Sequence, residues 1–282
     1  MMEELKQLME TMSAAEAGRI FSERHGHLPV RKKSGWNLFL PVPENGRLLE
    51  VGAGFGEDTV AVAGRVKQIH ALVPDETNEA VLRRHLEERD VDNVEVLVSE
   101  EPWALSLGDG SVDTVTMEEA AATGFEIERG HVPSLAREWK RVLAPGGAVL
   151  LSVRNPLERK LGIGSLRAKL QVKADQDVLN RVVKRRGRER SGLPGPGALI
   201  QIMKQAGFET PQVYAPVPNE TQAQMILPLD DDRAIRYFLH HLLRKNSPLM
   251  RAAIGGADLL VRLKLFRHIV PAYFMIFRTS EE

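Results

Sequence analysis

The regular alternation of short apolar runs with helix-length amphipathic segments between residues 47 and 153 constrains the fold of this chain most strongly. Because parallel strands need a crossover connection, usually a helix, this alternation predicts an α/β fold with a doubly wound parallel sheet. The run 148–153 (AVLLSV) is apolar on both faces, which is typical of a central parallel strand. Strands are predicted at residues 47–51, 68–74, 94–99, 112–118 and 148–153, and helices at residues 57–66, 80–89 and 133–143.

The segments on either side of this α/β region have different patterns. Residues 2–24 have apolar positions near a 3.6-residue period and predict a helix. Beyond residue 154 we expect a basic helical stretch (157–190), a helix (195–208), a strand (212–218), amphipathic helices within 231–268 and a last strand (272–278). The predicted organisation is an N-terminal helical segment (1–44), a core (45–218) with a basic helical insertion (154–190), a helical cap insertion (219–270) and a final core strand (271–282).

Composition narrows the class of protein. The chain has 282 residues, of which 43% are hydrophobic, so it can bury a large core. It contains no cysteine, which excludes disulfides, thiolate metal sites and cysteine nucleophiles. The N-terminus is acidic and amphipathic, unlike a secretory signal, and no apolar run approaches the ~20 residues of a membrane-spanning helix. These features predict a cytoplasmic protein and give no indication of its oligomeric state.

Charge is distributed unevenly along the chain, although the formal net charge is zero. Residues 1–153 contain 16 Lys and Arg against 26 Asp and Glu. Residues 154–190 contain 12 against 4, and residues 232–268 contain 8 against 2. This asymmetry indicates either that the C-terminal half meets an anionic partner or that its helices have solvated basic faces.

The stretch 48–56 (LLEVGAGFG) places three glycines at alternate positions after an apolar run and one acid. A dinucleotide-binding loop follows G-x-G-x-x-G, and its third glycine would here fall on Glu57. The three glycines permit a tight turn that a ligand can approach without side chains in the way. Glu50, at the end of the strand, would repel a pyrophosphate but can bind an ammonium group. The loop therefore favours a ligand with a cationic amine and no phosphate, such as S-adenosylmethionine.

With three further stretches, this loop makes the chain resemble the class I S-adenosylmethionine-dependent methyltransferases, in particular the small-molecule group related to ubiquinone-biosynthesis methyltransferases. Residues 105–113 (LSLGDGSVD) resemble the family's LPFPDGSFD before the fourth strand. Residues 138–147 (EWKRVLAPGG) resemble its E-x-x-R-V-L-x-P-G-G before the fifth, and residues 206–208 (AGF) resemble the end of its helix before the sixth. The resemblance covers roughly residues 45–153, with a looser match at 193–218 and 272–278. It implies a Rossmann-like seven-stranded sheet whose last strand is antiparallel.

The resemblance also implies which residues bind the cofactor, S-adenosylmethionine, at the carboxyl ends of the first strands. The glycine loop would hold the methionine and ribose portion, Glu101 would accept the adenine amine, and Pro102 would lie beside the ring. Glu118 or Glu119, after the fourth strand, would face the sulfonium and the substrate. The expected cofactor-binding residues are Glu50, Gly52, Ala53, Gly54, Phe55, Gly56, Val73, Asp75, Glu101, Pro102 and Glu118.

One position departs from the family pattern. The family usually has Asp or Glu at the end of the second strand, where the carboxylate accepts hydrogen bonds from the ribose, and this chain has Val73. Either Asp75 or Glu76 reaches the ribose instead, or water and backbone groups hold it. Losing charge-assisted hydrogen bonds costs about 1.5–3 kcal/mol, which leaves open a chain that binds the cofactor weakly or has lost activity.

No catalytic residue is assigned from the sequence. Methyl transfer from a sulfonium is an in-line displacement, so positioning supplies much of the acceleration, and a base is needed only if the nucleophile starts protonated. His131, Glu118 and Glu119 are candidate bases, with a surface loop position as the alternative for His131. No metal is expected, because the adjacent His240 and His241 point to different sides of a helix.

The expected substrate is a small molecule methylated on oxygen or nitrogen, anionic or amphipathic because basic segments adjoin an apolar cap. Enzymes that methylate the amines of adenine or glutamine share an N/D-P-P-Y/F run after the fourth strand, and residues 117–120 (MEEA) lack it. The basic run 182–188 (VVKRRGR) has no interleaved aromatics, so nucleic acid is disfavoured. Peripheral contact with an anionic membrane surface stays open. The alternatives are a non-catalytic methyltransferase-like binding protein and a nucleic-acid methyltransferase.

Overall fold

The computed structural model describes most of the α/β region and parts of both flanking regions. The described residues are 2–25, 39–118, 124–125, 127–155, 193–217, 223, 225–242, 256, 259–268, 270 and 272–281. The predicted basic helical stretch 157–190 lies outside them, so its conformation stays a prediction.

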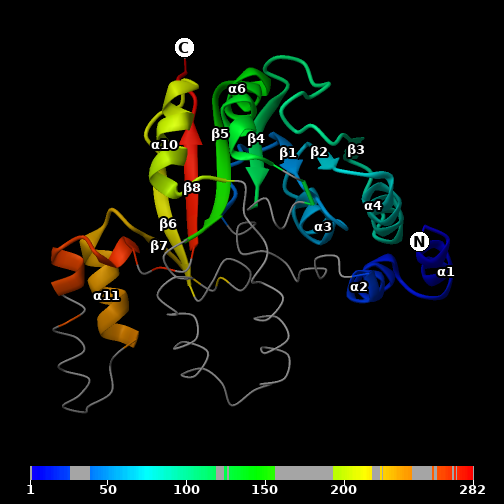
Figure 1. Ribbon diagram of the computed structural model, residues 1–282, viewed down its shortest axis with the longest axis horizontal. Coiled ribbons are helices and arrows are strands. Elements are labelled where there is room, and N and C mark those ends of the chain that lie inside the picture. The colour runs from blue at the N-terminus through cyan, green and yellow to red at the C-terminus, as the bar shows by residue number, and fades with distance from the viewer. Residues whose placement is uncertain are drawn as a thin grey trace.

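Eight strands form one sheet in the order β3-β2-β1-β4-β5-β8-β6-β7 (Figure 1). Strands β1 to β5 pair in parallel, whereas β8 runs antiparallel to both β5 and β6. In Figure 1 the arrow of β8 accordingly points opposite to that of β4. The strands are β1 (Arg47–Val51), β2 (Gln68–Val73), β3 (Val94–Val98), β4 (Val112–Met117), β5 (Leu143–Arg154), β6 (Gln212–Val217), β7 (Met225–Pro228) and β8 (Ala272–Arg278).

The predicted α/β fold with an antiparallel last strand is confirmed, and the sheet has one strand more than the seven expected. The additional strand is β7, which pairs antiparallel with β6 at the edge of the sheet. It lies within the segment 219–270 that the sequence predicts as a helical cap. A strand of four residues is too short for the two-residue alternation to be recognised in the sequence. Its conformation is fixed instead by pairing with β6.

Helices cover both faces of the sheet (Figure 1). On one face, α3 (Glu57–Ala63) and α4 (Glu76–Glu88) bury apolar side chains against Leu48, and on the other α6 (Val132–Val142) and α10 (Pro196–Gln205) do so against Leu49. Adjacent residues of β1 serve opposite faces because side chains alternate along a strand. This is the doubly wound arrangement, and it places the carboxyl ends of β1, β2, β3 and β4 along one edge.

Two family-like motifs of the sequence form one cluster in the structure. Arg141, near the end of α6, donates to Glu138 (2.6 Å), to the carbonyl oxygens of Leu105 (3.2 Å) and Leu107 (2.8 Å), and to Asp109 (2.6 Å). The Glu138 carboxylate also accepts from the backbone N–H of Leu105 (2.8 Å). Arg141 thus fixes the loop between β3 and β4, and with it the start of β4.

The predicted N-terminal helix is two helices, α1 (Met2–Thr11) and α2 (Ala14–His25). The break occurs at Ser13, whose hydroxyl accepts from the N–H of Glu16 (3.4 Å), and the N–H of Ala14 donates to both oxygens of Glu88 on α4 (3.1 Å each). Ser13 with Glu16 matches the S-x-x-E signature of a helix start. Docking against α4 therefore fixes where α2 begins.

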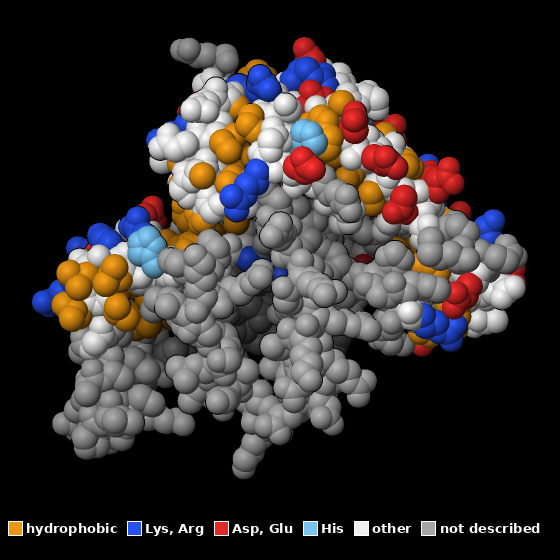
Figure 2. Space-filling model, viewed as in Figure 1, with side chains coloured by type: hydrophobic (Ala, Val, Ile, Leu, Met, Phe, Trp, Pro, Cys, Tyr) orange, Lys and Arg blue, Asp and Glu red, His pale blue; other side chains and the backbone are white. Residues whose placement is uncertain are grey.

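The C-terminal region includes α11 (Asp232–Leu242) and a short helical turn before η3 (Phe266–His268). An ion pair between Lys264 and Asp232 (2.7 Å) joins the turn to α11. Leu259 and Leu263 of the turn are 55% and 57% exposed. Figure 2 shows apolar and basic side chains together at this end of the molecule, and acidic side chains on the upper right of the view. None of the helices within the described residues is long and apolar enough to cross a membrane.

Candidate cofactor site

The carboxyl ends of β1 and β4 bring acidic side chains to one edge of the sheet. Glu50 of β1 is in register with Thr116 of β4, and Glu118 follows two residues later on the same face. The Thr116 hydroxyl is buried and makes no hydrogen bond with a described residue. The edge thus combines two carboxyl groups with a hydroxyl group.

Glu50 is buried, with 5% of its surface exposed. Thr59, in the first turn of α3, donates a hydrogen bond of 2.6 Å to its carboxyl group. The pKa of Glu50 is raised to about 8, mainly by burial and also by the negative charges of Asp58, Glu118 and Glu57, while the Thr59 hydrogen bond lowers it in part. At neutral pH the buried carboxyl group therefore holds its proton unless a cation approaches.

Glu57 adds a second acid at the start of α3. Burial, with a contribution from Asp58, raises the pKa of Glu57 to about 7, and one of its carboxyl oxygens is buried without a hydrogen bond among the described residues. Neither Glu50 nor Glu57 forms an ion pair within the part of the chain that the structure describes. A buried acid and a partly buried acid, both without a partner cation, favour a cationic ligand.

The glycine loop between β1 and α3 has the backbone conformation that its three glycines permit. Gly52, Gly54 and Gly56 have φ angles of 82°, 56° and 90°, in the left-handed region. A Cβ atom added to Gly54 would meet nothing within 4 Å, whereas one on Gly56 would lie 2.4 Å from Leu82 Cδ1. Gly54 therefore faces open space, and Gly56 allows α4 to pack closely against the loop.

Strand β2 and the helices α4 and α2 hold the outer side of the loop. The N–H groups of Gly52 and Ala53 both donate to the carbonyl oxygen of Leu72 (2.9 and 3.1 Å). The carbonyl oxygen of Phe55 lies 2.9 Å from Nδ1 of His85 on α4. The phenyl ring of Phe55 packs against Gly18 of α2, where a side chain would collide with it. These contacts fix the backbone of the loop on one side and leave Gly54 open on the other.

At the end of β2, the predicted ribose position carries no polar side chain. Val73 is 0% exposed and packs in the core between the sheet and α3 and α4. Asp75 is the N-cap of α4: its two carboxylate oxygens accept from the N–H and the side-chain amide of Asn78, both at 2.9 Å. Asp75 therefore has a structural role that the sequence analysis did not consider.

After β3, the residues predicted to meet the adenine lie in a short turn. Glu101 is exposed and Pro102 is buried, and the N–H of Glu101 donates to the Ser99 hydroxyl (3.1 Å). The next residue, Trp103, stacks on His131 with ring centroids 4.0 Å apart and an interplanar angle of 27°. His131, at the end of η2 (Arg129–His131), is therefore packed against an aromatic ring rather than projecting from a surface loop.

Several residues of this site have no obvious signal in the sequence. Thr59 and Thr116 are ordinary helix and strand residues, and only the packing of α3 and the β1–β4 register bring them beside Glu50. Trp103 directly follows Glu101 and Pro102, the residues predicted to contact the adenine. Its place in the sequence could therefore have indicated that it belongs to the site. Glu119 lies outside the described residues, as does His27. Within the described residues, no cluster of three His, Cys, Asp or Glu could hold a metal ion.

Comparison with known proteins is consistent with this geometry. Residues 49–151 match the family model of a methyltransferase domain. Together with the strand order, the match identifies a methyltransferase domain with the class I fold within this chain. A search of curated proteins finds no match to the chain.

Solved structures of low sequence identity share the fold. The Haemonchus contortus phosphoethanolamine N-methyltransferase 2, in complex with S-adenosylmethionine, is 17% identical over 89% of this chain and 54% of its own, with a TM-score of 0.51. The YcgJ protein of Bacillus subtilis is 17% identical over 87% of this chain and 96% of its own (TM-score 0.50). A Methanosarcina mazei methyltransferase is 12% identical over 86% and 95% (TM-score 0.50). The chain therefore spans about half the length of the Haemonchus protein.

The two glycines of the loop should respond differently to the same substitution. Gly54→Ala should cost about 1 kcal/mol of unfolding free energy, because only the left-handed φ opposes it. Gly56→Ala should cost more, because its Cβ also collides with Leu82. Gly54→Ala should nevertheless weaken S-adenosylmethionine binding by about tenfold or more, since the methyl enters the open space. Urea unfolding and calorimetric titration measure both effects; unchanged affinity in Gly54→Ala would show that the cofactor lies elsewhere.

The buried acids should make the ligand-free protein less stable as pH rises. The folded-state pKa of Glu50, about 8, lies above its ordinary 4.5, so the folded state binds the proton more tightly. Stability should therefore fall between about pH 4.5 and 8, by up to roughly 1.4 kcal/mol per pH unit for this group. Glu50→Gln, which can still accept from Thr59, should flatten the dependence in urea unfolding at several pH values. Glu87→Gln, an exposed control, should not, and equal slopes in wild type and Glu50→Gln would refute the assignment.

Proposed function

We propose that the enzyme transfers the methyl group of S-adenosylmethionine to an oxygen or nitrogen atom of a small molecule, as in the group related to ubiquinone-biosynthesis methyltransferases. One observation carries the cofactor assignment: Glu50 is buried without an ion-pair partner among the described residues, and it immediately precedes the glycine loop, in which a Cβ on Gly54 would meet nothing within 4 Å. A ligand with a cationic amine and a sulfonium supplies the missing positive charge, and a glycine loop without side chains admits its nucleoside.

The predicted binding roles follow the loops at the carboxyl edge. The backbone of Gly52, Gly54 and Gly56, with Ala53 and Phe55 between them, would hold the methionine and ribose portion. Glu50 would bind the amino group, directly or through water, and an approaching ammonium would lower the raised pKa of this carboxyl group and release its proton. The exposed carboxylate of Glu101 would accept the adenine amine, with Pro102 beside the ring.

The chemistry requires little beyond positioning. When bound, S-adenosylmethionine supplies an electrophilic methyl group on a sulfonium. The residues of this chain have to align the acceptor with that methyl and keep competing water away. Glu118, after β4, would face the acceptor and could take its proton if it starts protonated. His131 is less suited to that role, because its ring is stacked on Trp103.

Three observations support a small acceptor with anionic or amphipathic character. After β4 the chain lacks the N/D-P-P-Y/F run shared by enzymes that methylate the amines of adenine or glutamine, and reads MEEA at residues 117–120. The helical turn near α11 exposes Leu259 and Leu263 beside the exposed Arg262, a surface that combines apolar area with positive charge. The similar Haemonchus protein was solved with phosphomonomethylethanolamine, a small phosphate-bearing amine.

Asp75 should contribute to stability rather than to cofactor affinity. Asp75→Ala removes the N-cap of α4 and should cost about 1 kcal/mol of unfolding free energy. Asp75→Asn keeps a capping oxygen and should cost much less. In calorimetric titration, both variants should bind S-adenosylmethionine within about twofold of wild type. A fall of about tenfold in both would show that Asp75 replaces the ribose-binding acid absent at Val73.

Radiolabel partition tests the substrate class directly. The protein is incubated with methyl-tritiated S-adenosylmethionine and a cell extract, and the extract is then separated into small-molecule, nucleic-acid and protein fractions. Label above a no-enzyme control should enter the small-molecule fraction. Gly54→Val, in which a branched side chain fills the cofactor space, serves as the inactive control. Label in RNA or DNA would replace the proposal by nucleic-acid methylation.

A further inference from the structure

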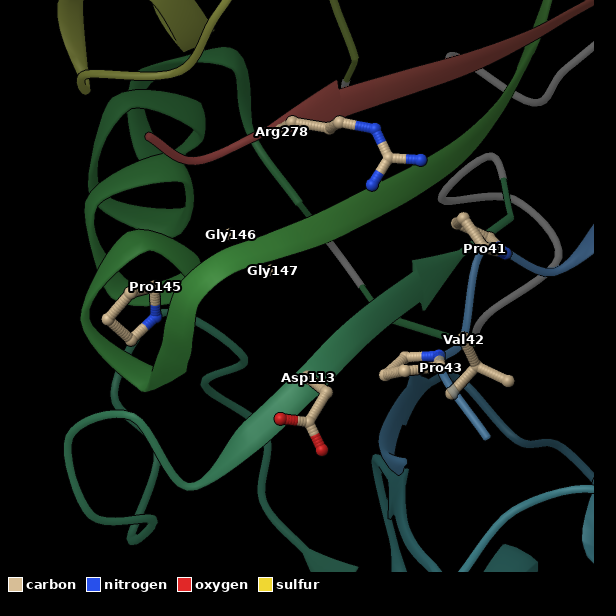
Figure 3. A pocket seen from close by; sticks show the side chains of 8 residues that line it. All are labelled: Pro41, Val42, Pro43, Asp113, Pro145, Gly146, Gly147 and Arg278. Carbon is tan, nitrogen blue, oxygen red and sulfur yellow. The ribbon is translucent and has the colours of Figure 1, made fainter. Parts of the chain in front are cut away.

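A pocket lies at the amino end of the parallel strands (Figure 3), at the opposite end of the sheet from the glycine loop. Its volume is about 400 Å³, within the ~300–1,000 Å³ of typical small-molecule sites. Its lining includes Pro41, Val42, Pro43, Asp113, Pro145 and Arg278. Asp113 and Glu118 are five residues apart along β4, so the pocket is about 16 Å from the carboxyl edge at ~3.3 Å per residue.

The pocket exists because the pairing of β4 with β5 is interrupted. Val112 pairs with Leu143, and the next pair is Thr114 with Ala148. Residues 144–147 of β5 therefore stand opposite the single residue Asp113. Such extra residues bend a strand away from its neighbour, and here the displaced segment forms one wall.

The walls are fixed by hydrogen bonds on both sides. The Thr114 hydroxyl donates to the carbonyl oxygen of Pro41 (3.1 Å), and the N–H of Gly46 donates to that of Pro43 (2.9 Å). The N–H of Thr279 donates to the carbonyl oxygen of Gly147 (2.9 Å). Since proline rings also fix their own φ angles, the pocket is preformed.

The acid in the pocket is already neutralised. Asp113 accepts from the N–H of Arg47 (2.7 Å) and from its guanidinium Nε (3.1 Å) and Nη2 (3.0 Å). These hydrogen bonds hold the pKa of Asp113 below its ordinary value. The Arg47–Asp113 pair therefore adds no net charge to the lining.

Arg278 is the charge in the pocket that lacks a partner. Its backbone is fixed by pairing with Ala148 and by the Glu209 N–H bond to its carbonyl oxygen (3.0 Å). Figure 3 shows its guanidinium extending from β8 across the pocket mouth towards Pro41. Within the described residues its side chain forms no ion pair or hydrogen bond, and Glu281, which lies against Gly146, does not pair with it.

We propose that this pocket is a second ligand site, which binds a small organic carboxylate with an apolar body. The planar guanidinium of Arg278 matches a carboxylate in two parallel hydrogen bonds. The apolar body lies against the rings of Pro41 and Pro43 and the side chain of Val42. The site is separate from the cofactor edge, so its occupancy does not require S-adenosylmethionine.

Ligand-detected fluorine NMR with 4-fluorobenzoate tests the proposal, with neutral 4-fluorobenzamide as the matched probe. The benzoate should bind, and the benzamide should bind about fivefold more weakly or not at all, because it cannot pair with Arg278. Arg278→Gln should weaken benzoate binding by about fivefold, whereas the control Arg89→Gln, at an exposed position on another part of the surface, should not change it. Val42→Phe, which fills the pocket, should abolish binding. Unfolding midpoints of each variant verify the fold.

Three outcomes would overturn the proposal. Equal binding of benzoate and benzamide would show that the Arg278 charge plays no part. Equal losses in Arg278→Gln and Arg89→Gln would indicate non-specific attraction to surface arginines. Displacement of the benzoate by inorganic phosphate at equal concentration would show recognition of charge without the apolar body. S-adenosylmethionine affinity, measured alongside, should be unchanged in Arg278→Gln, which separates this site from the proposed methyl-transfer function.

Discussion

The burial of Glu50 without a cation is the constraint on which the site depends. A carboxyl group that is 5% exposed, with a pKa raised to about 8, is costly to ionise in the ligand-free protein. Thr59 stabilises it with one hydrogen bond, but no Lys, Arg or His among the described residues forms an ion pair with it. The fold therefore holds an acid ready for a ligand that brings positive charge, and this is the property that a sulfonium amino acid satisfies.

The remaining loops are fixed so that this edge keeps its shape. Asp75 caps α4, Arg141 holds the loop before β4, and His85 and Gly18 hold Phe55 on the outer side of the glycine loop. None of these contacts has to change when a ligand enters beside Gly54. Glu50, Glu118 and Trp103 all lie at or just after the carboxyl ends of strands, which is the edge where we propose that the cofactor binds.

The secondary structure of the α/β region was predictable because its signals are local. The ranges of β1 and β8 agree with the prediction, and β2, β3, β4 and β6 each end one residue earlier than predicted. Strand β5 begins at Leu143, five residues before the predicted start. The elements that differ are those decided by contacts: β7 exists through pairing with β6, and α2 begins where Glu88 caps it. The glycine loop was recognised from spacing alone, because left-handed φ angles need glycine.

The sequence by itself determined the class of fold and the glycine loop with its preceding acid, because each follows from residue type at a fixed spacing. The resemblance to the family drew attention to Val73, where the family usually has an acid. Only the tertiary structure decided that Glu50 is buried beside Thr59, that Asp75 is committed to capping α4, and that Arg47 neutralises Asp113 and leaves Arg278 unpaired. These properties depend on residues that are far apart in the chain or in different elements. Burial and electrostatic environment arise only when the elements pack together.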